Sequence, residues 1–183
     1  NLIFEKARLN LSKGNFYVLV GDSGIGKTTL IDILSNLIEV SEMNIFVNGE
    51  EVDNLSGNIS YMSQEPFIID GDLKENILFN QSKNTNYDDN LLAKSALLDN
   101  SGNPIIKTDD FIENGKNLSG GQKQRIGFAR LLHSKSSILI LDEFTSSLDK
   151  TNTLNLLKTI HDIKNNHIII GVSHDKLVID SAD

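Results

Sequence analysis

Continuous apolar runs of strand length alternate along this chain with segments whose apolar residues recur every three or four positions. The runs at 16–20, 138–141 and 167–172 are rich in Val, Ile, Leu and aromatic residues, as in strands buried within a parallel sheet. Helical periodicity predicts helices over 28–37, 120–132 and 151–163. Their apolar positions are Leu30, Ile33, Leu34 and Leu37, then Ile126, Ala129 and Leu132, and then Leu154, Leu157, Ile160 and Ile163. This alternation predicts an α/β fold with a mainly parallel sheet flanked by helices.

Shorter apolar segments predict further strands at 2–4, 9–11, 45–47 and 59–62. The Asn48-Gly49 pair follows the third of these segments and favours a hairpin turn, so a short antiparallel part is expected beside the main sheet. Pro66 ends regular structure after the fourth segment.

The pattern changes between residues 70 and 117, where strand-like runs disappear. Helical spacing predicts helices over 73–79 and 90–98, and the polar residues 84–90 favour a mobile loop before the second. A turn is expected at Gly102-Asn103-Pro104. We therefore predict one domain over 1–183, with a core formed by about 1–69 and 118–183 and a small helical subdomain over about 70–117.

Composition limits the partners. A length of 183 residues suits one domain with a substantial core. The formal net charge of -8 disfavours nucleic acid as the main partner, although one nest of backbone N–H groups is enough for a nucleotide. The chain has no cysteine and no apolar run of the ~20 residues that a membrane span needs. We expect any membrane role to depend on a partner or on a separate segment.

The segment GDSGIGKTT, residues 21–29, has the spacing of a phosphate-binding loop and joins a predicted strand to a predicted helix. Its glycines let successive N–H groups point at one anion, and the helix dipole adds positive potential there. Lys27 would reach the β- and γ-phosphates, and the Thr28 hydroxyl would hold Mg²⁺. The alternative is a glycine-rich turn that binds nothing, which the strand and helix on either side make less favourable. The predicted cradle consists of Gly21, Asp22, Ser23, Gly24, Ile25, Gly26, Lys27, Thr28 and Thr29.

Two carboxylates, Asp142 and Glu143, close the apolar run 138–141. Adjacent strand residues point to opposite sides, so we expect different roles: magnesium binding for one and the orientation or deprotonation of water for the other. An exposed acidic turn is the alternative interpretation. His174 follows the last predicted strand, so the phosphate loop and all three of these side chains are expected at the carboxyl ends of strands.

Ser119 and Gln122 have the spacing of a capping box, which would explain a helix start by itself. The glycines between them, Gly120 and Gly121, are left unexplained because they weaken a first helical turn; they would let another surface approach the backbone. A bare helix N-terminus with a serine hydroxyl would be a second phosphate site. We expect it to lie too far from the phosphate loop of its own chain, so that a second copy would supply the partner.

Together these segments resemble the ATP-binding-cassette ATPases, the nucleotide-binding domains of ABC transporters. Residues 21–29 look like the Walker A loop, Gln64 in YMSQEPF like the Q-loop glutamine, and ILILDE like Walker B with the catalytic glutamate. LSGGQ is identical to the family signature, and the segments SSLD and GVSHD look like the D-loop and the switch-histidine motif. The six motifs follow the family order across essentially the whole chain. The resemblance implies a P-loop NTPase fold.

The resemblance also implies the functional residues and partners. ATP would lie between Walker A of one subunit and the signature of another in a head-to-tail homodimer, or in a pair with a paralogous ATPase domain. The catalytic residues would be Glu143, His174, Lys27 and Gln64, the magnesium ligands Thr28, Gln64 and Asp142, and the nucleotide contacts the phosphate cradle with Ser119, Gly120, Gly121, Gln122 and Asp149. Asp149 would communicate between the two sites.

The subtype resembles an exporter, because QEPFIIDGDLKENILF follows the exporter pattern and Glu113-Asn114-Gly115 resembles the exporter X-loop. We therefore expect ATP-driven export together with a transmembrane domain, at the cytoplasmic face of a membrane. No residue clearly fills the place of the adenine-stacking aromatic, for which Phe4 is a poor substitute, so we expect weak ATP binding and a chain truncated at both ends.

Three alternatives remain. A P-loop kinase or GTPase would not need LSGGQ, and a GTPase should show an Asn-Lys-x-Asp motif, which is absent. A soluble ABC-type ATPase acting as a mechanical clamp in DNA repair or translation should carry basic or coiled-coil insertions. A non-catalytic nucleotide-binding module is disfavoured by the intact Glu143 and His174.

Overall fold

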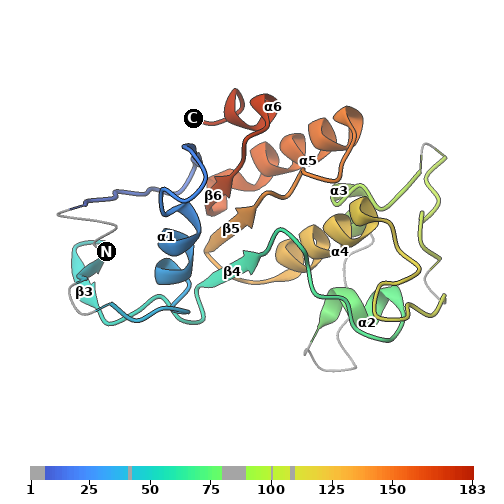
Figure 1. Ribbon diagram of the computed structural model, residues 1–183, viewed down its shortest axis with the longest axis horizontal. Coiled ribbons are helices and arrows are strands. Elements are labelled where there is room, and N and C mark those ends of the chain that lie inside the picture. The colour runs from blue at the N-terminus through green and yellow to red at the C-terminus, as the bar shows by residue number, and fades with distance from the viewer. Residues whose placement is uncertain (1–6, 41–42, 80–89, 100, 108–109) are drawn as a thin grey trace.

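The computed structural model describes residues 7–40, 43–79, 90–99, 101–107 and 110–183. A four-stranded parallel sheet lies at its centre, with the strand order β1-β6-β5-β4 (Figure 1). Its strands are β1 (Phe16–Leu19), β4 (Ile59–Met62), β5 (Ile138–Asp142) and β6 (Ile168–Val172). The predicted α/β class is confirmed, and the strands coincide closely with the apolar runs.

Helices cover both faces of this sheet. On one face, Ile140 and Ile170 pack around Ile31 of α1 (Lys27–Leu34). On the other face lie α4 (Gly120–His133), α5 (Lys150–Ile163) and α6 (Lys176–Ile179). Phe128 and Leu156 of these helices pack in one cluster with Leu139, Leu141 and Ile169, the strand residues that point to this face. The strands are therefore buried on both sides, which is why their sequences are continuously apolar rather than alternating. The short 3₁₀ helix η1 (Lys164–Asn166) links α5 to β6.

Helix α1 is shorter than its apolar periodicity predicts. Asn36 adopts a left-handed φ of 57°, and the Leu37 N–H donates to the Asp32 carbonyl while the Asn36 N–H donates to that of Ile33. This is a Schellman ending, which places Leu37 outside the helix with 65% of its surface exposed. Leu37 is thus wrongly predicted as a packing residue, as is Leu154 of α5, which is 46% exposed.

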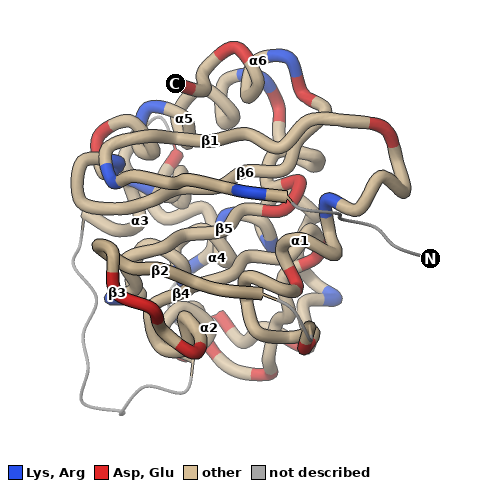
Figure 2. The backbone as a smooth tube through the Cα atoms, turned by 90° about the vertical axis from the view of Figure 1, so that its left-hand side faces the viewer, with Lys and Arg blue, Asp and Glu red and all other residues tan. Residues whose placement is uncertain are grey.

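The antiparallel part is a two-stranded hairpin of β2 (Ile45–Val47) and β3 (Glu50–Val52). Asn48 and Gly49 have φ values of 54° and 88°, which only a primed turn uses at both central positions, so the predicted hairpin is confirmed. Figure 2 marks acidic residues along β3, and both glutamates of this strand are exposed. The strand predicted at 9–11 is wrong, because these residues have no regular structure, and the strand predicted at 2–4 lies outside the described residues.

The helices α2 (Leu73–Leu78) and α3 (Asn90–Lys94) pack with Ile126 and Ala129 of α4 around a second apolar cluster. Helix α3 ends earlier than predicted, since Ala96 has a left-handed φ of 55° and Leu98 forms a bridge with Pro104 instead. The predicted loop over 84–90 falls almost wholly outside the described residues. The subdomain boundaries stay a prediction. Within the described part of the chain, no helix has the length and apolar character to cross a bilayer.

Candidate nucleotide site at the carboxyl edge of the sheet

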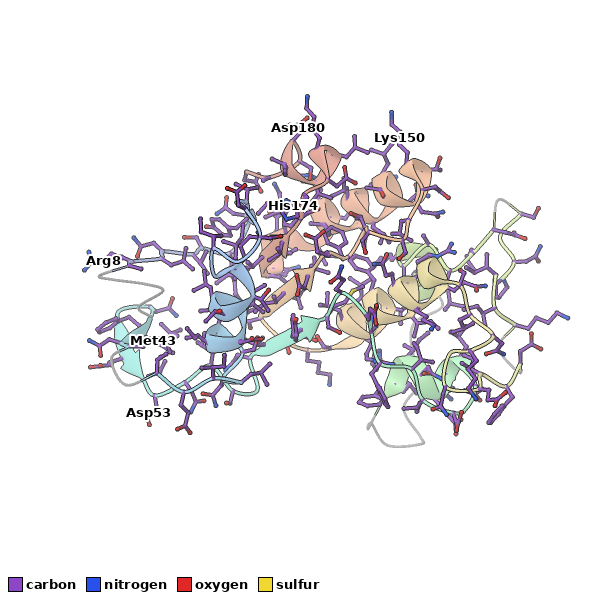
Figure 3. All side chains as sticks on the ribbon, in the orientation of Figure 1. Arg8, Met43, Asp53, Lys150, His174 and Asp180 are labelled. Carbon is purple, nitrogen blue, oxygen red and sulfur yellow. The ribbon has the colours of Figure 1, made fainter. Side chains whose placement is uncertain are left out.

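Four loops meet at one edge of the central sheet because its strands are parallel. The phosphate loop follows β1, Gln64 follows β4, Glu143 follows β5 and His174 follows β6. Figure 3 shows His174 beside the end of β6. The sequence prediction that these segments lie at strand ends is confirmed, and the sheet order places β6 between the strands that lead to the phosphate loop and to Glu143.

The phosphate loop has the backbone that its glycines permit. Gly21, Gly24 and Gly26 have φ values of 148°, 81° and 107°, respectively. Residues that carry a Cβ rarely adopt these backbone angles. The Lys27 ammonium folds back across the loop and donates to the Gly21 carbonyl at 2.6 Å and to the Asp22 carbonyl at 3.0 Å. The chain's own cation is therefore held over the concave backbone where a phosphate group would lie.

The N-terminus of α1 differs from those of α2, α4, α5 and α6. Asp72, Ser119, Asp149 and Asp175 cap α2, α4, α5 and α6 with side-chain oxygens. Gly26 occupies the corresponding position of α1, and among the described residues no side chain caps it. Since an α-helix leaves its first N–H groups without intrahelical partners, this end is suited to an anion.

Asp142, the last residue of β5, shares the α1 side of the sheet with Tyr61 of β4. The Tyr61 hydroxyl donates to Asp142 Oδ2 at 3.1 Å. Burial raises the pKa of Asp142 above its usual value and the nearby Asp32 raises it further, while the Tyr61 hydrogen bond and Lys27 oppose the rise. Burial and the Asp142 charge also raise the pKa of Tyr61, so the phenol stays protonated as a donor.

Sequence reasoning missed Tyr61. One signal could have identified it: Tyr61 is the second-last residue of the strand before Gln64, and it points to the face opposite to that of Met62.

The backbone turns away from the direction of β5 at Glu143, the first residue after the strand. Its backbone has a left-handed φ of 45°, and its N–H donates to the Val172 carbonyl at 2.9 Å. Its carboxylate Oε1 lies 3.8 Å from His174 Nε2, a charge contact when the imidazole is protonated. Asp142 and Glu143 do have different surroundings, as expected, but the predicted reason is wrong: Glu143 is turned by its backbone conformation and not by strand alternation.

The residues predicted to hold Mg²⁺ fit that ion chemically. Thr28 and Asp142 supply hard oxygen donors, and Lys27 is close enough to influence Asp142 electrostatically. Mg²⁺ usually binds one or two protein ligands and completes its shell with water and substrate phosphates. The described residues contain no cluster of three or more acidic, histidine or cysteine side chains placed to hold a metal.

The capping box at Ser119 and Gln122 is formed in full. The Ser119 hydroxyl oxygen accepts from the Gln122 N–H, and Gln122 Oε1 accepts from the Ser119 N–H. The description of this helix end as bare is therefore wrong. The hydroxyl proton of Ser119 is still free to serve as a donor, because its oxygen only accepts in this box.

The two glycines of this segment have an explanation within the chain. A Cβ on Gly121 would lie 2.9 Å from the Ser147 carbonyl oxygen, and one on Gly120 would lie 3.0 Å from the Ser147 hydroxyl. The surface that approaches the helix start is thus the chain's own loop after Glu143, a packing that the sequence alone did not indicate.

The remaining predicted residues are exposed. Gln64 lies two residues beyond β4. Asp149 is the N-cap of α5: its two carboxylate oxygens accept from the backbone and side-chain nitrogens of Asn152, which lowers the pKa of Asp149. This capping role was not predicted, and the predicted communication between sites stays a prediction. Phe4, the weak candidate for adenine stacking, lies outside the described residues.

Comparison with known proteins gives consistent matches. The model of the ABC transporter family matches residues 4–146. A Rickettsia typhi protein named as an export ATP-binding/permease protein is 35% identical, and the match covers 99% of this chain and 33% of the relative. The microcin-J25 export ATP-binding/permease protein of Escherichia coli is 33% identical, over 99% of this chain and 32% of its own length.

A solved structure has the same fold. The structure of a bacterial Atm1-family ABC exporter with ATP bound superposes with a TM-score of 0.80 at 24% identity, covering 94% of this chain and 32% of that one. The chain spans about a third of the length of the curated relatives it matches.

Proposed function

Because this chain belongs to the ABC transporter family, we propose that it binds and hydrolyses ATP as the nucleotide-binding domain of an exporter. The observation that supports this most directly is the convergence of three features at one sheet edge. These are the uncapped N-terminus of α1 beside Lys27, the half-buried carboxylate of Asp142, and the Glu143–His174 contact. Such a set can bind a polyphosphate, balance its charge and activate water.

In the proposed reaction, the phosphates of ATP replace the two carbonyl oxygens as partners of the Lys27 ammonium and accept hydrogen bonds from the N–H groups of the loop. Thr28 and Asp142 would hold Mg²⁺, with Gln64 completing the set, and the ion would neutralise charge on the phosphates. Glu143 would orient a water and accept its proton as the water oxygen bonds to the γ-phosphorus; the bond from this phosphorus to the bridging oxygen breaks, and ADP leaves with that oxygen. His174, beside Glu143, is placed to contact the same phosphate.

A second ATPase domain would complete the site. Ser119 is the N-cap of α4, whose first turn packs against the loop that follows Glu143. Its hydroxyl oxygen accepts in the capping box, so its proton is available to an anion. In a head-to-tail pair, either with a second copy or with a paralogous domain, Ser119 would face the phosphate bound by the other subunit's loop. ATP would then form part of the interface, and hydrolysis would weaken it.

The transmembrane partner would dock beside the segment after Gln64. Phe67 and Phe111 expose 67% and 64% of their surfaces, and their segments are joined by the Gly71–Ile112 bridge. Exposed aromatic side chains of this size are typical of interaction surfaces. Docking there would place the domain at the cytoplasmic face of a membrane.

The activity is tested with purified wild-type protein and two variants. Lys27→Ala should abolish ATP hydrolysis because the phosphate cradle loses its cation. Glu143→Gln should bind ATP and hydrolyse it far more slowly, because the amide keeps the shape and loses the basicity. Turnover of Glu143→Gln equal to wild type would refute the role of Glu143.

The assembly is tested by sedimentation of Glu143→Gln with ATP and Mg²⁺. We expect a dimer that is absent without nucleotide and that Ser119→Arg abolishes while nucleotide binding persists. A protein that stays monomeric at high concentration, measured with the full polypeptide, would contradict the paired site.

Both relatives described above are named as export ATP-binding/permease proteins, which favours this proposal over the clamp ATPase of DNA repair or translation. The net charge of -8 also disfavours nucleic acid as a partner.

A further inference from the structure

Gln124 is a buried amide on the helix that begins with the signature segment. Its residue exposes 2% of its surface, and it lies in the second turn of α4. The amide nitrogen donates to the Glu143 carbonyl at 3.2 Å and to the Ser146 hydroxyl at 2.7 Å, and the amide oxygen accepts from the Ser147 N–H at 3.0 Å. All three partners lie within residues 143–147, in the loop between β5 and α5.

The first of these partners has a strained backbone. A left-handed φ of 45° at a glutamate costs energy and persists only where several contacts enforce it. Here the Glu143 N–H is held by the Val172 carbonyl, and the Glu143 carbonyl accepts both from Gln124 and from the Ser146 N–H. This conformation turns the carboxylate away from the strand direction and places it 3.8 Å from His174.

We propose that Gln124 is a positioning residue for catalysis: its amide holds the Glu143 peptide in the left-handed conformation and thereby aims the carboxylate. The inference rests on the proposed ATPase function, in which Glu143 activates water. It also couples α4 to the loop that begins with Glu143. Ser119 lies at the start of this helix, and Gln124 in its second turn donates to the Glu143 carbonyl. Contacts made by Ser119 with a nucleotide on the other subunit would thus act on the chain's own Glu143 through Gln124.

Two substitutions separate positioning from packing. Gln124→Glu keeps the length and one acceptor but removes both donors, so the Glu143 carbonyl would face a carboxylate. Gln124→Met keeps the length and removes all polar atoms. Thr159→Val is the control: it deletes the hydrogen bond from the buried Thr159 to the Lys94 carbonyl, between α5 and α3, which does not involve the catalytic loop.

ATP hydrolysis is measured at a temperature where each variant is folded by circular dichroism. We expect both Gln124 variants to lower kcat roughly ten- to hundredfold with KM for ATP within about twofold, because a displacement of about 1 Å at a reacting group has this effect. Thr159→Val should lower the melting temperature and leave kcat unchanged. A Gln124 variant with reduced stability and wild-type kcat would overturn the proposal, as would a raised KM with unchanged kcat.

A double-mutant test isolates the route through Glu143. In the Glu143→Gln background, adding Gln124→Met should slow the residual hydrolysis no further, because the side chain that Gln124 positions is already inactive. A further tenfold loss in that background would refute the inference. Failure of the proposed function would look different, since the wild-type protein itself would then show no ATP hydrolysis.

Discussion

Alanine at Gly121 should destabilise the protein, although alanine normally stabilises a helix. The new Cβ would lie 2.9 Å from the Ser147 carbonyl oxygen and 3.3 Å from a methyl of Leu148. Because the first contact is with backbone, relief requires the whole loop to move, and overpacking of this kind costs about 1–3 kcal/mol. Replacing glycine in a helix returns up to ~1 kcal/mol, so the net loss should be about 1 kcal/mol.

Gly120→Ala is the matched comparison. Its Cβ would lie 3.0 Å from the Ser147 hydroxyl oxygen and 3.1 Å from Ser147 Cβ. The exposed hydroxyl can rotate away, and a shift of a few tenths of an ångström relieves the contact with Cβ. The helix gain and the rotamer cost then nearly cancel.

Both variants are measured by thermal and urea unfolding. A difference of about 1 kcal/mol should appear as a melting temperature roughly 2–4 °C lower for Gly121→Ala than for Gly120→Ala in a protein of this size. Equal stability of the two variants, or a more stable Gly121→Ala, would show that the loop after Glu143 does not rest on the helix start as described.

Three further outcomes follow from the same structure. Tyr61→Phe should lower the free energy of unfolding by about 1–3 kcal/mol in metal-free buffer. Loss of the Tyr61 donor raises the pKa of Asp142 further, so stability should fall with rising pH over a wider range than in wild type. A cost in urea unfolding that does not change with pH would contradict this. Asp149→Ala should lose about 1 kcal/mol with the α5 cap, whereas Asp149→Asn should retain most of it, as thermal melts would show. Gly127→Ala should cost roughly 1–2 kcal/mol in urea unfolding, because its Cβ would lie 2.6 Å from the rigid ring of Pro66; wild-type stability there would refute the packing.

The sequence predicted the central sheet well because local and tertiary demands agree there. The strands of the sheet are buried on both faces, so apolar continuity and strand length give the same answer at β5 and β6. Helix ends were less predictable: apolar periodicity continues to Leu37, while Asn36 stops α1 by a left-handed turn that asparagine tolerates. Asparagine at that position was a signal, but a weak one beside the leucine.

The sequence predicted which residues form the candidate site better than it predicted how they are arranged. Motif spacing identified Lys27, Asp142 and Glu143, but the backbone of Glu143 depends on Val172 and Gln124, which are remote in sequence. Burial of Gln124 could have been suspected from its spacing with Phe128, one turn later on the same face. Local pattern carries no information about the loop that approaches Gly121, so the reason for that glycine required the fold.

The position of β1 at the edge of the sheet has a consequence for how the chain is made. Among the described strands, β1 pairs with β6, which joins Phe16 to Ile169. The Phe16 backbone is further held by Asp183, whose carboxylate accepts from the Phe16 N–H and whose own N–H donates to the Phe16 carbonyl. Contacts of such long sequence separation form late, because the intervening chain must first be closed into a loop. During synthesis, the strand that leads to the phosphate loop therefore leaves the ribosome early and stays unpaired until residues 168–172 have emerged. If the phosphate loop binds nucleotide as proposed, nascent chains that lack these residues should not retain it.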